Sequence, residues 1–115
     1  MYELMIEGMF SAAHQLVGSN GPCEELHGHT WKVQAVFSGN EVDKIGMLMD
    51  FKVLKKQLSD VIQKYDHAFL NKVFAFSPTA ENIARDIFVK LKEVNKLVIK
   101  VSVWESPTAC AAYQE

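Results

Sequence analysis

The sequence predicts an α+β fold in which two strand hairpins flank a pair of helices, in the order ββααββ over a single domain of residues 1–115. Two patterns predict it. Apolar residues alternate with polar ones near both ends of the chain, which is typical of strands with one buried face. Between these segments apolar residues recur at three- and four-residue steps, which is typical of amphipathic helices. We therefore expect a four-stranded antiparallel sheet with both helices on one face.

The first hairpin is predicted from residues 2–10 (YELMIEGMF) and 30–38 (TWKVQAVFS). The stretch VGSNGP between them has the composition of a loop. In the second strand the apolar residues alternate with mainly polar neighbours, so they should share one face. These residues are Trp31, Val33, Ala35 and Phe37.

Two helices are predicted in the middle of the chain. Asp50 can cap a helix that begins at Phe51 and ends near Tyr65. After the expected loop DHAFLNKVFAFSP, Thr79 can cap a second helix. The apolar stripe of the first helix comprises Phe51, Leu54, Leu58, Val61, Ile62 and Tyr65, and that of the second comprises Ile83, Ile87, Phe88 and Leu91.

The second hairpin is predicted from residues 97–105 (LVIKVSVWE) and 109–114 (ACAAYQ), joined by the turn signal SPT. A small open sheet of this kind has two edges with unpaired backbone groups. Such edges are often paired with another chain. We expect the protein to oligomerise through them, and a monomeric mass in sedimentation would contradict this.

Composition excludes several classes of partner. The net charge is −2 and the lysines are scattered, so no basic face for nucleic acid is expected. No apolar run approaches the roughly 20 residues of a membrane span. Cys23 and Cys110 do not form a disulfide framework, which fits a reducing compartment. We expect a cytoplasmic protein that binds neither nucleic acid nor membrane.

The segment CEELHGH, residues 23–29, indicates a metal site. His27 and His29 are two residues apart, so on an extended segment their rings leave the same face. Catalytic zinc typically takes three protein ligands and keeps a fourth position open. His14, at the end of a strand-like run, is the candidate for the third. The alternative is that these histidines only hydrogen-bond to backbone.

Five motifs resemble one family in order and spacing: His14, CEELHGH, DHAFLN at 66–71, PTAEN at 78–82 and WESP at 104–107. The family is that of the 6-pyruvoyltetrahydropterin and 6-carboxytetrahydropterin synthases. The resemblance implies the tunnelling fold, in which trimers close a β-barrel and commonly stack into hexamers, with active sites at subunit interfaces. It also implies Zn²⁺ held by His14, His27 and His29.

The resemblance assigns Cys23 as the catalytic base, although a structural thiol or a fourth zinc ligand remains an alternative. One branch of the family, which cleaves the side chain of dihydroneopterin for folate synthesis, instead has Glu three residues before the first histidine of HGH. This chain has both Cys23 and Glu24. Glu24 is therefore an alternative base, or an inert acidic residue of the loop.

The remaining roles also come from the resemblance. Asp66 and His67 resemble a proton relay that cooperates with Cys23 of a neighbouring subunit. Adjacent residues rarely touch, so we expect no direct contact between the two. Glu105 resembles the residue that anchors the pterin ring, whose neighbouring N–H groups match a carboxylate. Thr79 and Ala80 resemble residues that contact the pterin.

Three functions follow as hypotheses. The first converts 7,8-dihydroneopterin triphosphate to 6-carboxy-5,6,7,8-tetrahydropterin, or to the related 6-pyruvoyl product, on a route to nucleosides such as queuosine. The second cleaves dihydroneopterin to 6-hydroxymethyl-7,8-dihydropterin for folate synthesis. The third is a zinc-stabilised pterin-binding module without turnover. No cluster of basic residues identifies a triphosphate subsite, and Lys32, Lys52 and Arg85 are the candidates.

Overall fold

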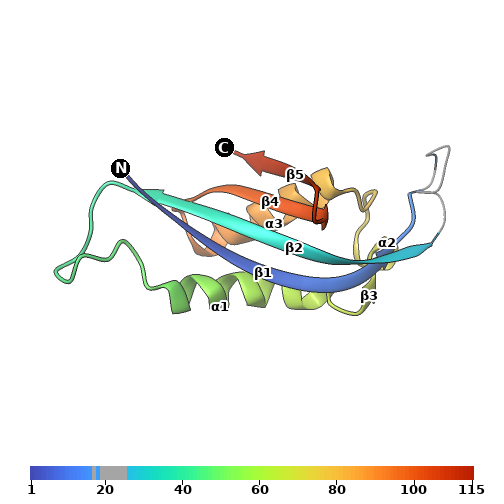
Figure 1. Cartoon of the computed structure of the whole chain (residues 1–115), viewed down its shortest axis with the longest axis horizontal. Coiled ribbons are helices and arrows are strands. Elements are labelled where there is room, and N and C mark those ends of the chain that lie inside the picture. The colour runs from blue at the N-terminus through green and yellow to red at the C-terminus, as the bar shows by residue number, and fades with distance from the viewer. Residues whose placement is uncertain (17, 19–25) are drawn as a thin grey trace.

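The computed structural model describes residues 1–16, 18 and 26–115 of the chain. Two long strands dominate its sheet (Figure 1). β1 (Tyr2–His14) and β2 (His27–Gly39) are 13 residues each and pair antiparallel along their whole length. Both strands extend beyond their predicted ends, and the extensions contain all three histidines of the expected metal site.

The second hairpin completes the antiparallel part of the sheet. β4 (Val98–Ser106) pairs with β2, and β5 (Ala109–Gln114) pairs with β4. The α+β class and the antiparallel hairpins are confirmed. The predicted number of four strands is corrected, because a two-residue strand, β3 (Ala68–Phe69), pairs parallel with β1. The order across the sheet is β3-β1-β2-β4-β5.

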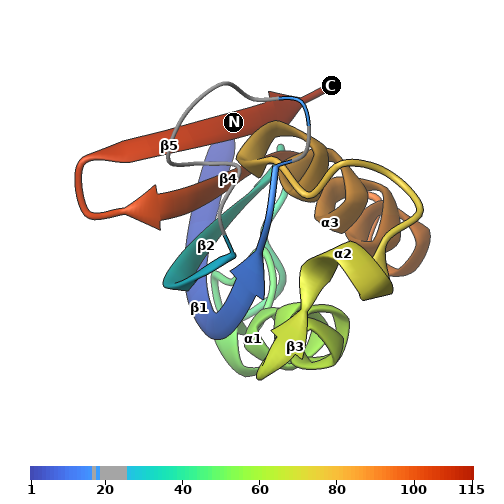
Figure 2. The same ribbon diagram turned by 90° about the vertical axis from the view of Figure 1, so that its right-hand side faces the viewer.

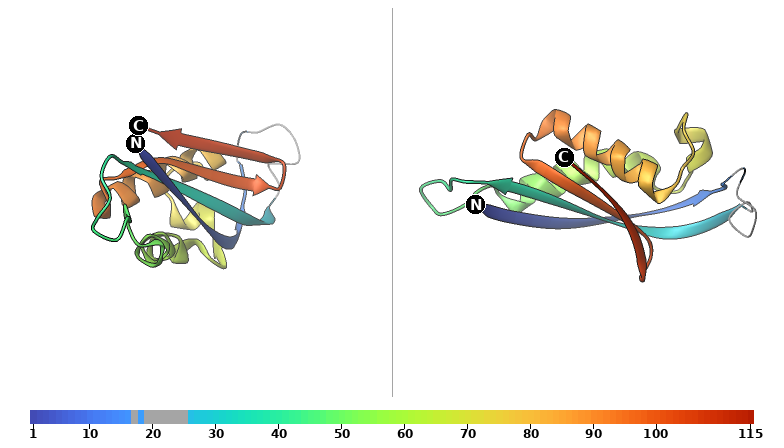
Figure 3. Two further views of the ribbon diagram at one scale, coloured as in Figure 1. Left: turned by 60° about the vertical axis from the view of Figure 1, so that its left-hand side comes forward. Right: turned by 90° about the horizontal axis from the view of Figure 1, so that it is seen from above.

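Both main helices cover one face of this sheet (Figures 2 and 3). α1 (Phe51–Ile62) continues as a turn of 3₁₀ helix, η2 (Gln63–Tyr65), and α3 is Ala80–Val94. The predicted caps are confirmed: the side chain of Asp50 accepts from Lys52 N at 2.8 Å, and Thr79 Oγ1 accepts from Asn82 N at 3.2 Å. Among the described residues no helix is long and apolar enough to cross a membrane.

The core lies between the helices and the sheet. The predicted inward residues of β2 are fully buried. The predicted apolar stripe of α3 is also buried, and Phe88, its most exposed member, is only 1% exposed. Leu54, Leu58 and Ile62 form the buried side of α1. Phe51 was expected among them but is 51% exposed, because the first turn of α1 lies at the edge of β1, where Phe51 borders a surface hollow beside Met5.

Close packing of α1 on β1 depends on Gly8. A Cβ atom at this position would lie 2.9 Å from Ile62 Cδ1 and 3.2 Å from Leu58 Cδ2. These distances are shorter than normal carbon contacts, so any larger residue would push the helix side chains outward. Gly8 thus leaves the space on β1 that the side chains of Ile62 and Leu58 fill.

The stretch between the helices is more ordered than the loop that was predicted. It contains β3 and a single helical turn, α2 (Leu70–Val73). Before it, the hydroxyl of buried Tyr65 donates to Asp86 Oδ2 on α3 at 2.6 Å. This bond joins η2 to α3 and fixes the start of the segment that carries Asp66 and His67.

Candidate metal centre

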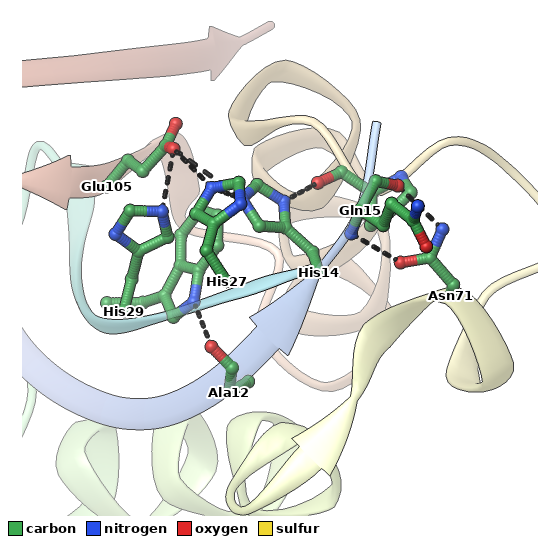
Figure 4. Close-up of polar contacts among 9 residues, drawn as sticks. Ala12, His14, Gln15, His27, His29, Asn71 and Glu105 are labelled. Carbon is green, nitrogen blue, oxygen red and sulfur yellow. Dashed lines mark hydrogen bonds and ion pairs between the residues drawn. The ribbon is translucent and has the colours of Figure 1, made fainter. Parts of the chain in front are cut away.

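Three histidines converge where β1 ends and β2 begins (Figure 4). His14 is the last residue of β1 and stands opposite His27, the first residue of β2. His29 is two residues further along β2, so its ring leaves the same face as that of His27. The Nε2 atoms of His14 and His27 are 3.0 Å apart. The structure thus brings together the three residues that the sequence selects.

Glu105 of β4 joins this group, which sequence reasoning did not foresee. Its Oε1 atom lies 3.0 Å from His29 Nε2, 3.5 Å from His14 Nε2 and 3.9 Å from His27 Nε2. One possible ligand atom from each of the four residues lies within 4.8 Å of every other. The sequence places Glu105 near the end of a predicted strand, and the structure shows that this strand, β4, pairs with β2.

Buried contacts orient the histidines. His14 is fully buried, and its Nδ1 lies 2.8 Å from the carbonyl oxygen of Pro78. A neutral imidazole that donates from Nδ1 has its lone pair on Nε2, which here faces the other histidines. Trp31 packs edge-on against His14 and His29, with ring centroids at 4.9 and 5.4 Å. Its indole N–H donates to Ala12 O at 3.3 Å.

The charge state of His29 suits metal binding. Burial lowers its pKa below 6.5, the rings of His27 and His14 lower it further, and the carboxylate of Glu105 acts in the opposite direction. A lowered pKa keeps the imidazole neutral at pH 7, and only the neutral ring can coordinate a metal. Burial thus prepares His29 as a ligand.

The three histidines are spaced to hold a divalent metal ion, and Glu105 Oε1 lies next to them. Four ligands at about 2.0–2.1 Å in a tetrahedron are roughly 3.3 Å apart. Glu105 Oε1 lies 3.0–3.9 Å from the three Nε2 atoms, and all four ligand atoms lie within 4.8 Å of one another. His29 Nε2 is buried and makes no hydrogen bond of good geometry to a described residue, although the carboxylate oxygen of Glu105 is close. A cation among these atoms would satisfy the nitrogen.

Asp66 and His67 touch each other, contrary to the expectation that adjacent residues would not. His67 Nδ1 lies 3.1 Å from Asp66 Oδ2. The contact arises because His67 has a φ of 57°, which turns its ring back toward the preceding residue. Asp66 Oδ1 also accepts from Ser11 N at 2.9 Å, and His67 N donates to Ser11 O. The pair is thereby fixed to the edge of β1.

The carboxylate of Asp66 is held in its ionised form. The N–H of Ser11 lowers its pKa below 3.8, and the neighbouring His67 lowers it further. The imidazole of His67 is 85% exposed. An ionised carboxylate on Nδ1 leaves Nε2 of an exposed ring free for proton transfer. Within one chain this ring is not part of the histidine group.

Asn71 has a positioning role that the sequence analysis missed. Its side-chain oxygen accepts from Gln15 N at 2.8 Å, and its amide donates to Gln15 O at 2.7 Å. The side chain therefore pairs with the backbone just beyond the end of β1, one residue after His14 (Figure 4). The clue was its place in the DHAFLN motif, because a side-chain amide offers an N–H donor and a C=O acceptor side by side, as a backbone peptide group does.

The expected pterin contacts lie beside this group. Ala80, at the start of α3, and Glu105 line a cavity of about 200 Å³. The side chain of Thr79 caps α3. Cys23 and Glu24, the two candidate bases, lie outside the described residues.

Comparison with known proteins identifies the family to which this fold belongs. The sequence model of the 6-pyruvoyl tetrahydropterin synthase family matches residues 3–115. The 6-pyruvoyl tetrahydropterin synthase of Caenorhabditis elegans has the same fold, with a TM-score of 0.88 and 33% identity, over 99% of this chain and 95% of that one. The protein therefore belongs to the 6-pyruvoyl tetrahydropterin synthase family.

Individual relatives carry two different names. The chain is 37% identical to the 6-carboxy-5,6,7,8-tetrahydropterin synthase of Haemophilus influenzae over 141 residues, which covers 100% of both chains. It is also 37% identical to the dihydroneopterin monophosphate aldolase of Pyrococcus furiosus over 105 residues, which covers 89% of this chain and 88% of that one. Sequence similarity alone does not separate the two activities.

Proposed function

We propose that the protein is a zinc-dependent lyase that converts 7,8-dihydroneopterin triphosphate and water to 6-carboxy-5,6,7,8-tetrahydropterin, with release of acetaldehyde and triphosphate. The observation that carries this proposal is the group of His14, His27, His29 and Glu105 at the end of the sheet. It occurs in a chain that aligns over its full length with a relative named for that product. Three imidazoles beside an open position are a common ligand set of catalytic zinc.

The three histidines would hold the zinc ion, and Glu105 would hold the pterin. Bound zinc would polarise the hydroxyl groups of the substrate side chain and acidify the adjacent C–H. Glu105 borders both the histidines and the cavity beside Ala80, so its carboxylate is placed to accept the paired N–H groups of a pterin ring. Thr79 and Ala80, at the start of α3, would contact the same ring.

Proton transfer requires a base and a relay. Cys23 would remove the proton next to the polarised hydroxyl, and a thiolate beside a cation has a lowered pKa. His67, oriented by Asp66, would exchange protons through its exposed ring. Because this ring stands away from the histidines of its own chain, we propose that it acts in the site of a neighbouring subunit.

Free sheet edges support such an assembly. β3 covers β1 only at Ala12 and Ala13, so most of that edge has no partner strand among the described residues. β5 forms the other edge of the sheet. Backbone groups along both edges can pair between chains, which would give the trimer or hexamer that the resemblance implies.

The second candidate function is cleavage of the dihydroneopterin side chain to 6-hydroxymethyl-7,8-dihydropterin. It is favoured by the Pyrococcus furiosus relative, an aldolase by name, at the same 37% identity. The sequence also offers Glu24 next to Cys23 as an alternative base. The two functions differ in which of these neighbouring residues removes the proton.

Product analysis tests both proposals. Zinc-loaded protein and its Cys23→Ala and Glu24→Ala variants would be incubated with dihydroneopterin and with its triphosphate, and the pterin products identified by mass spectrometry. A carboxypterin lost only in Cys23→Ala supports the first function. A hydroxymethylpterin lost only in Glu24→Ala supports the second. Binding of both pterins without any product would contradict both and leave a pterin-binding module.

A further inference from the structure

A second cavity opens next to the histidines on the opposite face of the sheet. It has a volume of about 530 Å³ and is lined both by His29 and Glu105 and by Lys32 and Trp104. It exists because β2 and β4 separate here: their pairing begins at Lys32 and Trp104, so residues 27–31 have no partner on β4. The cavity at this gap therefore extends from the outer face of the sheet to His29 and Glu105 of the metal centre.

Lys32 supplies positive charge to this cavity. Its Nζ atom lies 4.6 Å from the centre of the Trp104 ring, so the ring carries the ammonium group on its face. Lys32 is half-buried and forms no ion pair with any carboxylate in the described part of the chain. The other charged group of the cavity, Glu105, is turned toward the histidines. The ammonium group can therefore bind an anion.

A chain of hydrogen bonds holds the Trp104 ring in place. Its indole N–H donates to Gln34 Oε1 at 3.0 Å, and Gln34 Nε2 donates to Glu7 Oε1 at 2.8 Å. The chain crosses β4, β2 and β1 on the face that the helices leave open. Because these hydrogen bonds hold the Trp104 ring in place, the position of the Lys32 ammonium group over the ring is also defined.

We infer that Lys32 and Trp104 form a subsite for the phosphate ester of a phosphorylated pterin. The inference rests on the proposed function, since it takes the substrate side chain to lie at the histidines. Lys32 is three residues from His29, about 10 Å along the strand. A side chain that extends from the metal centre through the gap would bring its phosphate groups to this ammonium.

The other two candidate cations lie elsewhere. Arg85 borders a separate cavity on α3 with Phe76 and Asp86. Lys52 lies in the first turn of α1, and that turn lies beside Ile6. Ile6 is eight residues from His14, roughly 25 Å along β1. Of the three, Lys32 alone lines a cavity that also reaches His29 and Glu105.

Binding of matched ligands tests the subsite. Dissociation constants for dihydroneopterin and for its triphosphate would be measured by calorimetry with wild-type protein, Lys32→Gln, Lys32→Arg and Lys100→Gln. Lys100 is the matched control, because it projects from the same face of β4 as Trp104 but pairs with Val36, further along the sheet. The quantity compared is the ratio of the two dissociation constants, so a general loss of folding cancels.

We expect wild-type protein to prefer the triphosphate and Lys32→Gln to lose about 10- to 100-fold of that preference, as for a lost hydrogen bond to a charged group. Lys32→Arg and Lys100→Gln should keep it. Inorganic tripolyphosphate should compete with the phosphorylated pterin in wild type and less well in Lys32→Gln, whereas competition that is equal in both would overturn the subsite.

The outcomes separate this inference from the proposed function. If both pterins are turned over but the ratio is unchanged in Lys32→Gln, the subsite is wrong and the proposed function stands. If the ratio falls but no pterin is turned over, the proposed reaction is wrong and the subsite stands. Failure to bind either pterin overturns both.

Discussion

Replacing Asn71 by alanine removes the side chain that joins the end of β1 to α2. In the wild type its amide makes two hydrogen bonds to the backbone of Gln15, at 2.8 and 2.7 Å. Gln15 directly follows His14, a ligand of the proposed zinc site. The substitution therefore tests whether the DHAFLN segment positions the metal ligands or only connects two helices.

The expected cost follows from the two bonds. Each contributes about 0.5–1.5 kcal/mol net, so their loss should lower the free energy of unfolding by about 1–3 kcal/mol. The backbone groups of Gln15 are half-buried, and water can satisfy part of what is lost, which favours the lower half of this range. We expect zinc affinity to fall by about tenfold, the lower end of the effect of losing a group that supports a metal ligand.

Urea denaturation at one protein concentration measures the first quantity, and competition with a chelator measures the second. Asn40→Ala is the control, because Asn40 lies in an exposed bend. Asn71→Asp keeps the acceptor for Gln15 N and loses the donor, so it should fall between wild type and Asn71→Ala. A stability within 0.5 kcal/mol of wild type, together with unchanged zinc affinity, would refute the reasoning, since bonds worth 0.5–1.5 kcal/mol each cannot vanish without effect.

Three further predictions follow from single groups. Tyr65→Phe should cost about 1–3 kcal/mol, because it removes the hydroxyl that donates to Asp86 and leaves Lys90 as the remaining partner of that carboxylate. Burial raises the pKa of Tyr65 above 10. The stabilisation by its hydroxyl is therefore present below pH 10 and is lost as the pH rises beyond it. If Tyr65→Phe is as stable as wild type at pH 8, the hydroxyl does not stabilise the fold. The pKa of Asp66 is lowered below 3.8 chiefly by Ser11 N–H, so its stabilising effect is present above pH 3.8 and is lost at more acidic pH; an NMR titration that gives 3.8 or more would disprove the contact. Glu105→Ala should raise the KM for the pterin at least tenfold, and steady-state kinetics with an unchanged KM would remove Glu105 as the anchor.

The alternation and spacing of apolar residues predicted the long strands and the two main helices of the fold. Alternation in β2 identified its buried residues, and single polar residues, Asp50 and Thr79, marked where both helices begin. These features depend on neighbours in sequence, so the sequence contains their signal directly. Phe51 fits the helical stripe equally well, yet it is exposed, because periodicity does not tell where the sheet beneath a helix ends.

The short elements could not be predicted in this way. β3 is two residues long and exists because Asp66 and Asn71 tie its two ends to β1. Neither propensity nor periodicity describes such contacts, since they join residues 55 and 56 positions apart.

The histidines of the candidate site were predictable, but their carboxylate neighbour was not. His27 and His29 share a face through simple alternation, and the hairpin pairs His14 with His27. Glu105 joins them only through the pairing of β4 with β2 and the bulge after Trp104. The direct contact of Asp66 with His67 likewise depends on one backbone angle that the sequence did not reveal.

The zinc site is the central claim, and X-ray absorption at the zinc edge of zinc-loaded protein tests it most directly. We expect a shell of nitrogen and oxygen atoms at about 2.0–2.1 Å, with imidazole scattering from three histidines and no sulfur. His29→Ala should lose most of its zinc, whereas Cys23→Ala should keep it. A sulfur atom at about 2.3 Å would contradict the account, because Cys23 would then close the site as a ligand instead of serving as the base.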